Sequence, residues 1–125
     1  MANPNIVNVT SILGKTAYLT PSDTAANVLL ANAASSGTVL KINQIVAANV
    51  DGTNAIDTTV AINTAAAGGG TSYPVVSTVS VPADATLIVA DKTTAIYLEE
   101  DKSIVVTSGT ASKIAYTISY EIISS

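Results

Sequence analysis

The sequence predicts an all-β protein in which antiparallel strands form a two-sheet β-sandwich. Short runs rich in Val, Ile, Thr and Tyr alternate apolar and polar residues with a period of two, which is typical of half-buried strands. Clusters of Gly, Pro, Asp, Asn and Ser separate these runs and indicate turns. Ten such runs favour two packed sheets over one, and a jelly roll is one arrangement of this kind.

The expected strands cover the chain from end to end. They are residues 6–10, 16–20, 27–31, 38–47, 57–63, 73–81, 86–90, 95–98, 103–107 and 113–123. We expect residues 1–125 to form a single β-sandwich domain, because this length is common for one domain and no linker or internal repeat divides the chain.

Two segments in the first third of the chain have a competing interpretation. Gly14-Lys15-Thr16 is similar to the end of a phosphate-binding loop, but that motif needs a Gly five positions earlier, where Val9 stands. A β-turn with a solvated Lys is therefore expected. In residues 22–35, Asp23 is a possible helix cap and apolar residues follow at helix-like spacing, so a helical turn competes there with the strand at 27–31.

Turn signals place the connections in the rest of the chain. Asp51-Gly52-Thr53-Asn54 predicts a hairpin over residues 45–62, and the Gly-rich residues 64–72 predict a mobile surface loop. Pro82-Ala83-Asp84 predicts a turn, and the acidic residues 99–101 predict a solvated hairpin end. In the last strand Ile114, Tyr116, Ile118 and Tyr120 alternate with small residues, so this face should enter the core, with Tyr120 and Ile122 closing the sandwich.

Two groups of acidic residues invite comparison with cation sites. Asp51, Thr53 and Asp57 loosely follow a calcium loop, but Ile56 and Ile62 occupy the positions where the EF-hand requires Gly and Glu, so turn residues are the better interpretation. Glu99, Glu100 and Asp101 could bind a divalent ion at a subunit interface, although a run of like charges is usually a solvated turn. We assign no metal ligands.

The composition excludes most enzyme chemistry. The chain has no His and no Cys, so it lacks the usual general base and the strongest nucleophile at neutral pH, as well as thiolate and imidazole zinc ligands. Its carboxylates lie mainly in expected turns, where they remain solvated. We therefore expect a protein that is not an enzyme, with no catalytic residues and no cofactor.

Charged residues make up only 11% of the chain, and the net charge is −4. Five Lys and no Arg argue against a nucleic-acid partner, and no apolar run approaches the roughly 20 residues that span a bilayer. A surface so poor in charge favours contact with neighbouring subunits over exposure to water. The expected partners are therefore other protein chains.

Several segments resemble a known class of proteins. They are residues 1–12 (MANPNIVNVTSI), 41–43 (KIN), 49–54 (NVDGTN), 80–87 (SVPADATL) and 97–101 (YLEED). Together they resemble small virion structural proteins of tailed bacteriophages, notably those that infect cyanobacteria. The similarity spans nearly the whole chain, but its motifs are turn and strand patterns.

The resemblance implies a capsid cement or decoration protein of the virion, made in the host cytoplasm. Such a protein would bridge neighbouring major capsid subunits or other virion proteins, as a dimer or trimer. Two alternatives stay open. One is a neck, tail or fibre component; the other is a carbohydrate-binding adhesin module, for which five Tyr are the only aromatic residues available.

Overall fold

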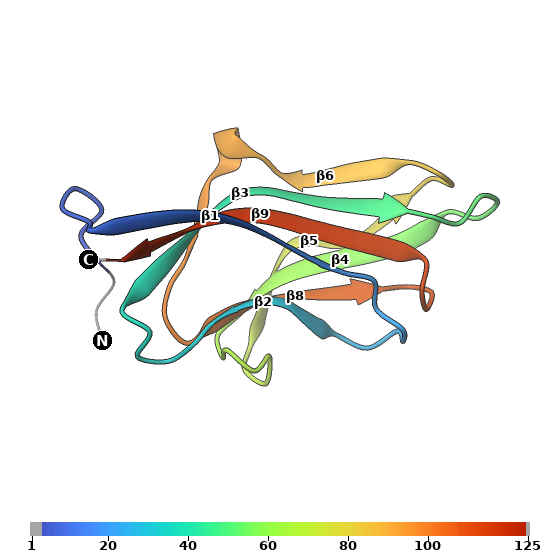
Figure 1. Ribbon diagram of the computed structural model, residues 1–125. Helices are drawn as coiled ribbons and strands as arrows, with labels where there is room; N and C mark the ends of the chain where they lie inside the picture. Colours follow the sequence, from blue (N-terminus) through green and yellow to red (C-terminus); the bar gives the residue numbers. More distant parts are fainter. Residues whose placement is uncertain (1–3, 125) are drawn as a thin grey trace.

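Two antiparallel sheets pack face to face in the computed structural model, which describes residues 4–124 (Figure 1). The first sheet contains, in spatial order, β1 (Ser11–Leu19), β9 (Ile114–Ser124), β3 (Thr38–Asn49) and β6 (Thr86–Ala90), and β7 (Ile96–Leu98) also pairs with β3. The second contains β2 (Asn27–Asn32), β8 (Lys102–Ser108), β4 (Ile56–Asn63) and β5 (Ser72–Val81). The predicted all-β sandwich is confirmed.

The pairing of the strands is that of a jelly roll. β1 pairs with β9, β2 with β8, β3 with β6 and β7, and β4 with β5, so the chain forms one long hairpin with its tip between β4 and β5. This hairpin is wrapped so that β9 also pairs with β3, and β8 with β4. Since β6 and β7 follow the same partner strand, they act as one strand interrupted by the 3-10 turn η1 (Lys92–Thr94).

The core lies between the sheets and is built mainly from aliphatic side chains. Ile45, Ile104, Ile114, Tyr116 and Ile118 are completely buried. The alternation predicted for the last strand is confirmed, and Tyr120 and Ile122 are partly buried against the core, as expected for residues that close the sandwich. Among residues 4–124 no helix is long and apolar enough to cross a membrane.

Two hairpins predicted from local turn signals are wrong. β3 and β4, on either side of Asp51-Gly52, belong to different sheets, and so do β7 and β8, on either side of the acidic residues 99–101. In a jelly roll most connections cross from one sheet to the other, and the β4–β5 connection is the one between consecutive strands that joins neighbours in a sheet. A turn motif reports a change of chain direction and carries no information on which strand pairs next.

The strand predicted at residues 6–10 is also wrong. The chain turns there, because the Asn5 side chain accepts a hydrogen bond from the Val7 backbone N–H at 3.0 Å and Val7 is 90% exposed. β1 instead starts at Ser11 and runs through Gly14-Lys15-Thr16, which is neither a phosphate-binding loop nor a β-turn. Nine consecutive residues of β1 pair with β9 without a register shift, and this continuous ladder outweighs the local preference of Gly14 for a turn.

The helical alternative for residues 22–35 is excluded. Asp23 accepts hydrogen bonds from the Ala25 backbone N–H and the Asn27 side chain, and this turn leads directly into β2. A β-bulge between Val28 and Leu30 places Leu29 and Leu30 both in the core. Two adjacent buried residues imitate the spacing of a helix, which explains the ambiguity of the sequence pattern.

The loop over residues 64–71 lies at the surface, as predicted, but hydrogen bonds hold it in place. The Asn63 side chain donates to the Gly70 carbonyl and accepts from the Ala65 and Gly70 N–H groups, and Ser103 donates to the Ala65 carbonyl. Gly68 has a φ of 83°, and a Cβ there would lie 3.1 Å from Val28. A small residue is needed at this position because the loop covers the outer face of the second sheet closely.

Candidate functional site: the outer face of the first sheet

Asp51, one of the acidic residues compared with cation ligands, stabilises its own turn. The Asp51 carboxylate accepts hydrogen bonds from the backbone N–H and hydroxyl of Thr53 and from Asn54. These bonds lower the pKa of Asp51 to about 2, and the bond from the Thr53 N–H has the largest effect. Its interpretation as a turn residue is therefore confirmed. Within residues 4–124 no three His, Cys, Asp or Glu side chains are grouped so that they could hold a metal ion.

An uncharged patch covers one half of the outer face of the first sheet. It consists of Tyr18, Val46, Ala48, Thr86, Ile88, Ala115 and Thr117. Their neighbours along the strands pack into the core, so these side chains point outward. Tyr18, Thr117, Val46 and Ile88 form one cross-strand row through β1, β9, β3 and β6. Tyr18 is 77% and Ile88 58% exposed, so large apolar side chains stand at both edges of the patch.

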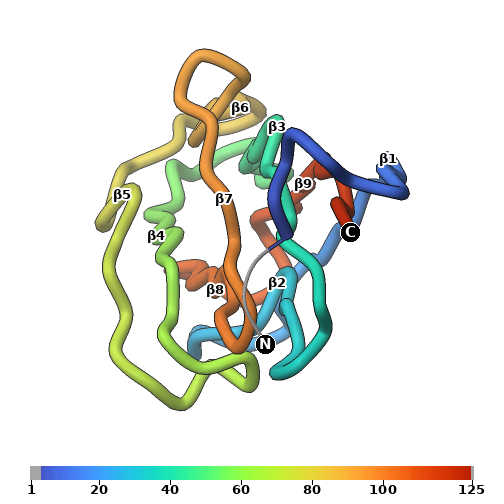
Figure 2. Tube along the Cα trace, turned by 90° about the vertical axis from the view of Figure 1, so that its left-hand side faces the viewer, coloured from blue at the N-terminus to red at the C-terminus, as the bar shows by residue number. Residues whose placement is uncertain are grey.

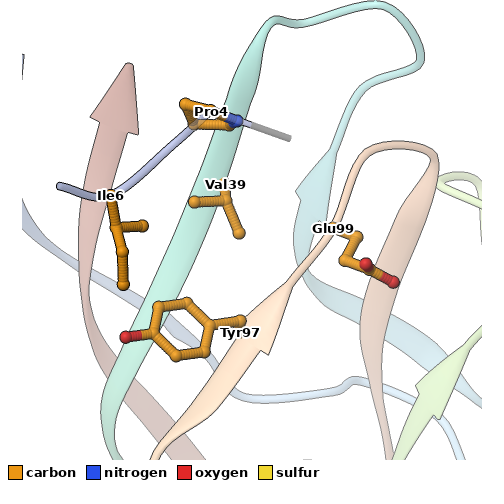
Figure 3. Close-up of a pocket in the computed structure, with 5 residues that line it drawn as sticks. All are labelled: Pro4, Ile6, Val39, Tyr97 and Glu99. Carbon is orange, nitrogen blue, oxygen red and sulfur yellow. The ribbon is translucent and has the colours of Figure 1, made fainter. Parts of the chain in front are cut away.

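A pocket of about 370 Å³ lies at the opposite end of the same face (Figure 3). Val39 of β3 forms its floor. Pro4 and Ile6, from the segment before β1, stand on one side, and Tyr97 of β7 on the other. Glu99 lies at the rim with its carboxylate directed away from Val39. The N-terminal segment thus packs over the outer face of the sheet, which explains why Val39 is buried although it lies outside the core cluster.

A polar groove of about 530 Å³ lies between the pocket and the uncharged patch. It is lined by Asn43, Gln44, Asp91, Lys92, Thr93 and Ser119. Asp91 caps the η1 turn by accepting hydrogen bonds from the backbone N–H and hydroxyl of Thr93. Both bonds lower the pKa of Asp91, and the bond from the hydroxyl has the larger effect. Sequence patterns gave no signal for this groove, because its residues come from β3, β9 and η1 and meet only in the folded chain.

A buried hydroxyl network joins the two sheets below this face. Tyr116 of β9 donates a hydrogen bond to the Thr107 carbonyl of β8 at 3.0 Å, and its hydroxyl is also bonded to that of Thr58 on β4. Burial raises the pKa of Tyr116 above its ordinary value of 10. The network fixes the two sheets relative to each other and offers no reactive group to solvent.

Tyr116→Phe should lower the free energy of unfolding by about 1–3 kcal/mol, because it leaves the buried Thr58 hydroxyl and Thr107 carbonyl without this partner. The folded-state pKa of Tyr116 lies above the unfolded value, so its stabilising effect is complete below pH 10 and is lost as the pH rises through the folded pKa. Urea unfolding at pH 7 and above pH 10 should therefore show a difference between wild type and variant that shrinks at high pH. A constant difference would contradict this assignment.

Comparisons with known proteins find similarity in three-dimensional structure and none in sequence families. Models of known protein families and curated protein sequences give no significant match. Among solved structures, a chain of the disulfide-linked pili of Bacillus endospore appendages is 14% identical, with a TM-score of 0.49 over 92% of this chain and 88% of that one. A chain of the infectious bursal disease virus Gx strain is 10% identical, with a TM-score of 0.43 over 89% of this chain and 33% of the other.

A chain of the T13 particle of the same virus is 8% identical to this protein, with a TM-score of 0.50 over 93% of this chain. The match covers 32% of the viral chain, so this protein spans about a third of its length. At such low identity the similarity shows a shared fold alone. The chain is thus similar, in its two-sheet β architecture, to part of a protein from an icosahedral virus particle.

Proposed function

We propose that this chain is a virion structural protein that attaches to a capsid as a cement or decoration protein. The observation that carries the proposal is the uncharged patch, which presents Tyr18 and Ile88 to solvent on the outer face of the first sheet. Protein interfaces are depleted of charged residues at their centre and enriched in aromatic ones. The sequence resemblance to virion proteins of tailed bacteriophages and the jelly roll, an architecture that capsid proteins use, point in the same direction.

The physical role would be to bridge neighbouring major capsid subunits. Any protein that binds the assembled shell and not its dissociated subunits stabilises the shell by mass action. This role requires shape and an apolar surface and needs no catalytic group, in keeping with our prediction that the chain is not an enzyme. Contacts between copies of the chain, in a dimer or trimer, would add to the same effect.

Ile88→Lys should abolish attachment to the particle. The fold should persist, because the Ile88 side chain is 58% exposed and does not belong to the core. A Lys buried in an interface without a partner costs several kcal/mol, which corresponds to a loss of affinity of about 100-fold or more. The measurement is the binding of purified protein to phage particles that lack it, followed by heat inactivation of the particles. Wild-type protein should raise their heat resistance, and the variant should not.

Tyr73→Lys is the matched control, because Tyr73 is a similarly exposed residue, 62%, on β5 of the other sheet. It should bind like wild type. Densitometry of intact particles should show copies in the hundreds, whereas a neck, tail or fibre component would be present in few. Low copy number, or equal binding by the Ile88 and Tyr73 variants, would overturn the proposal.

A further inference from the structure

The groove beside η1 forms where the pairing of β3 is irregular with both of its neighbours, β9 on one side and β6 on the other. A register shift between Ile42 and Gln44 marks a bulge in β3. A second shift, opposite Ile45 and Val46, lies at the end of β6, immediately before the chain leaves the sheet to form η1. Figure 2 shows this excursion, in orange, standing out from the sheet between β6 and β7. Bulges commonly re-aim side chains next to binding sites.

The bulge gives the groove two adjacent amide side chains. In a regular strand Asn43 and Gln44 would point to opposite faces, but both line the groove. β7 pairs with β3 up to Ile42 and β6 pairs from Ile45, so within the described chain Asn43 and Gln44 have no ladder partner on that side. The Asn43 amide is held by a hydrogen bond to Glu121 at 3.1 Å.

The chemistry of the lining fits a ligand rich in hydroxyl groups. All six lining residues are polar, and Asn43, Gln44 and Ser119 each carry both donor and acceptor atoms, as a sugar hydroxyl does. The Thr93 hydroxyl donates to Asp91 and can still accept. Lys92 and Asp91 contribute one charge of each sign, so the groove carries no net charge and does not favour a phosphate.

Tyr97, which lines the neighbouring pocket, lies on the same outer face of the sheet as the groove. Tyr97 pairs with Lys41, two residues before Asn43, and points to the same outer face because Leu98 and Ile96 on either side of it pack toward the core. Its side chain is 45% exposed. A sugar ring presents an apolar face and a polar edge, and an exposed aromatic ring beside hydrogen-bonding amides is complementary to both.

We infer that the groove formed by Asn43, Gln44, η1 and Ser119, together with Tyr97 of the neighbouring pocket, is a binding site for neutral saccharides. The inference is independent of attachment to a capsid, because the groove is complete in the isolated chain. A decoration protein with such a site would display a weak carbohydrate-binding function on the particle surface. Gln44 and Asn43 are positioned to bind the hydroxyl groups, and Tyr97 to stack against the ring.

The test is a titration of the full chain, labelled with ¹⁵N, with galactose, glucose, mannose and N-acetylglucosamine and their disaccharides, followed by amide NMR. Glycerol serves as the control for non-specific polyol effects and glucuronate for charge. The expected result is saturable shift changes confined to residues 43–44, 91–97 and 119 with at least one neutral sugar. Absence of saturable changes with every sugar, or changes located elsewhere, would overturn the inference.

Variants separate binding from folding. Gln44→Ala and Tyr97→Ala should each weaken binding about tenfold, as expected when one good hydrogen bond or stacking contact is lost. Asn8→Ala removes an exposed amide outside the groove and should bind like wild type. Spectra without sugar show whether each variant is folded. Wild-type affinity in a folded Gln44→Ala, Tyr97→Ala double variant would equally contradict the site, whether or not the protein attaches to a capsid.

Discussion

Replacing Ile118 by Ala should lower the free energy of unfolding by about 2–5 kcal/mol, which is a large part of the stability of a small domain. Ile118 is completely buried on β9 and lies opposite Ile45 of β3 and Ala17 of β1. With no Phe or Trp in the chain, the core depends on aliphatic side chains of this kind, and few larger neighbours can move to fill the cavity. Urea unfolding followed by circular dichroism gives the change.

The matched control is Ile88→Ala, the same substitution at an exposed position of the same sheet. Its effect on the free energy of unfolding should stay within about 0.5 kcal/mol. If both variants lost the same stability, Ile118 would not be part of a close-packed core. The control also tests whether the Ile88 side chain contributes to stability, which matters for the particle-binding experiment; the fold of Ile88→Lys is checked by the same unfolding measurement.

Asn49→Ala should cost about 2–4 kcal/mol, which is more than most polar substitutions, because one side chain holds two connections together. The buried Asn49 amide donates hydrogen bonds to the carbonyls of Asn54, Val81 and Pro82 at 2.9, 2.9 and 3.2 Å. Its oxygen accepts from the Asp51 N–H at 2.8 Å. Removing the Asn49 side chain leaves several partly buried backbone groups without a hydrogen-bond partner. Each of them that water cannot reach lowers the free energy of unfolding by about 1–3 kcal/mol.

Asn49→Asp tests the same hydrogen bonds by replacing the neutral amide with a carboxylate. At neutral pH a carboxylate would face the three carbonyl oxygens and lose stability relative to Asn, whereas protonation at low pH would relieve part of the repulsion. Asn54→Ala, at an exposed position of the same loop, should change stability by about 0.5 kcal/mol. Thermal unfolding at pH 7 and pH 4 distinguishes these outcomes. A mild effect of both Asn49 variants would show that the connections are held in another way.

Asn49 belongs to a set of three buried amides that the sequence patterns did not reveal. Asn32, Asn49 and Asn63 end β2, β3 and β4, and each bonds to the backbone or hydroxyl groups of a neighbouring connection. Asn at the end of an apolar run is an ordinary turn signal, so nothing local separates these residues from solvated ones such as Asn54. A sequence with few charges here uses neutral amides to fix its loops.

The sequence by itself determined the fold class and most strand positions. Alternating apolar residues in β9 and β4 identify strands with one buried face, since the hydrophobic effect acts on every second side chain whatever its partner. The missing His and Cys likewise restrict the available chemistry without reference to any structure. These are local or compositional properties, and the sequence contains them completely.

Only the tertiary structure decided which strands pair and what gathers on the outer face of the first sheet. The predicted hairpin at Asp51-Gly52 was wrong because pairing in a jelly roll joins segments as distant as β1 and β9, whose contact energy no local window contains. For the same reason Tyr18 and Ile88 become one surface, and Gln44 meets Lys92 across a groove. Long-range pairing places these side chains together, and local sequence sets only the direction in which each one points.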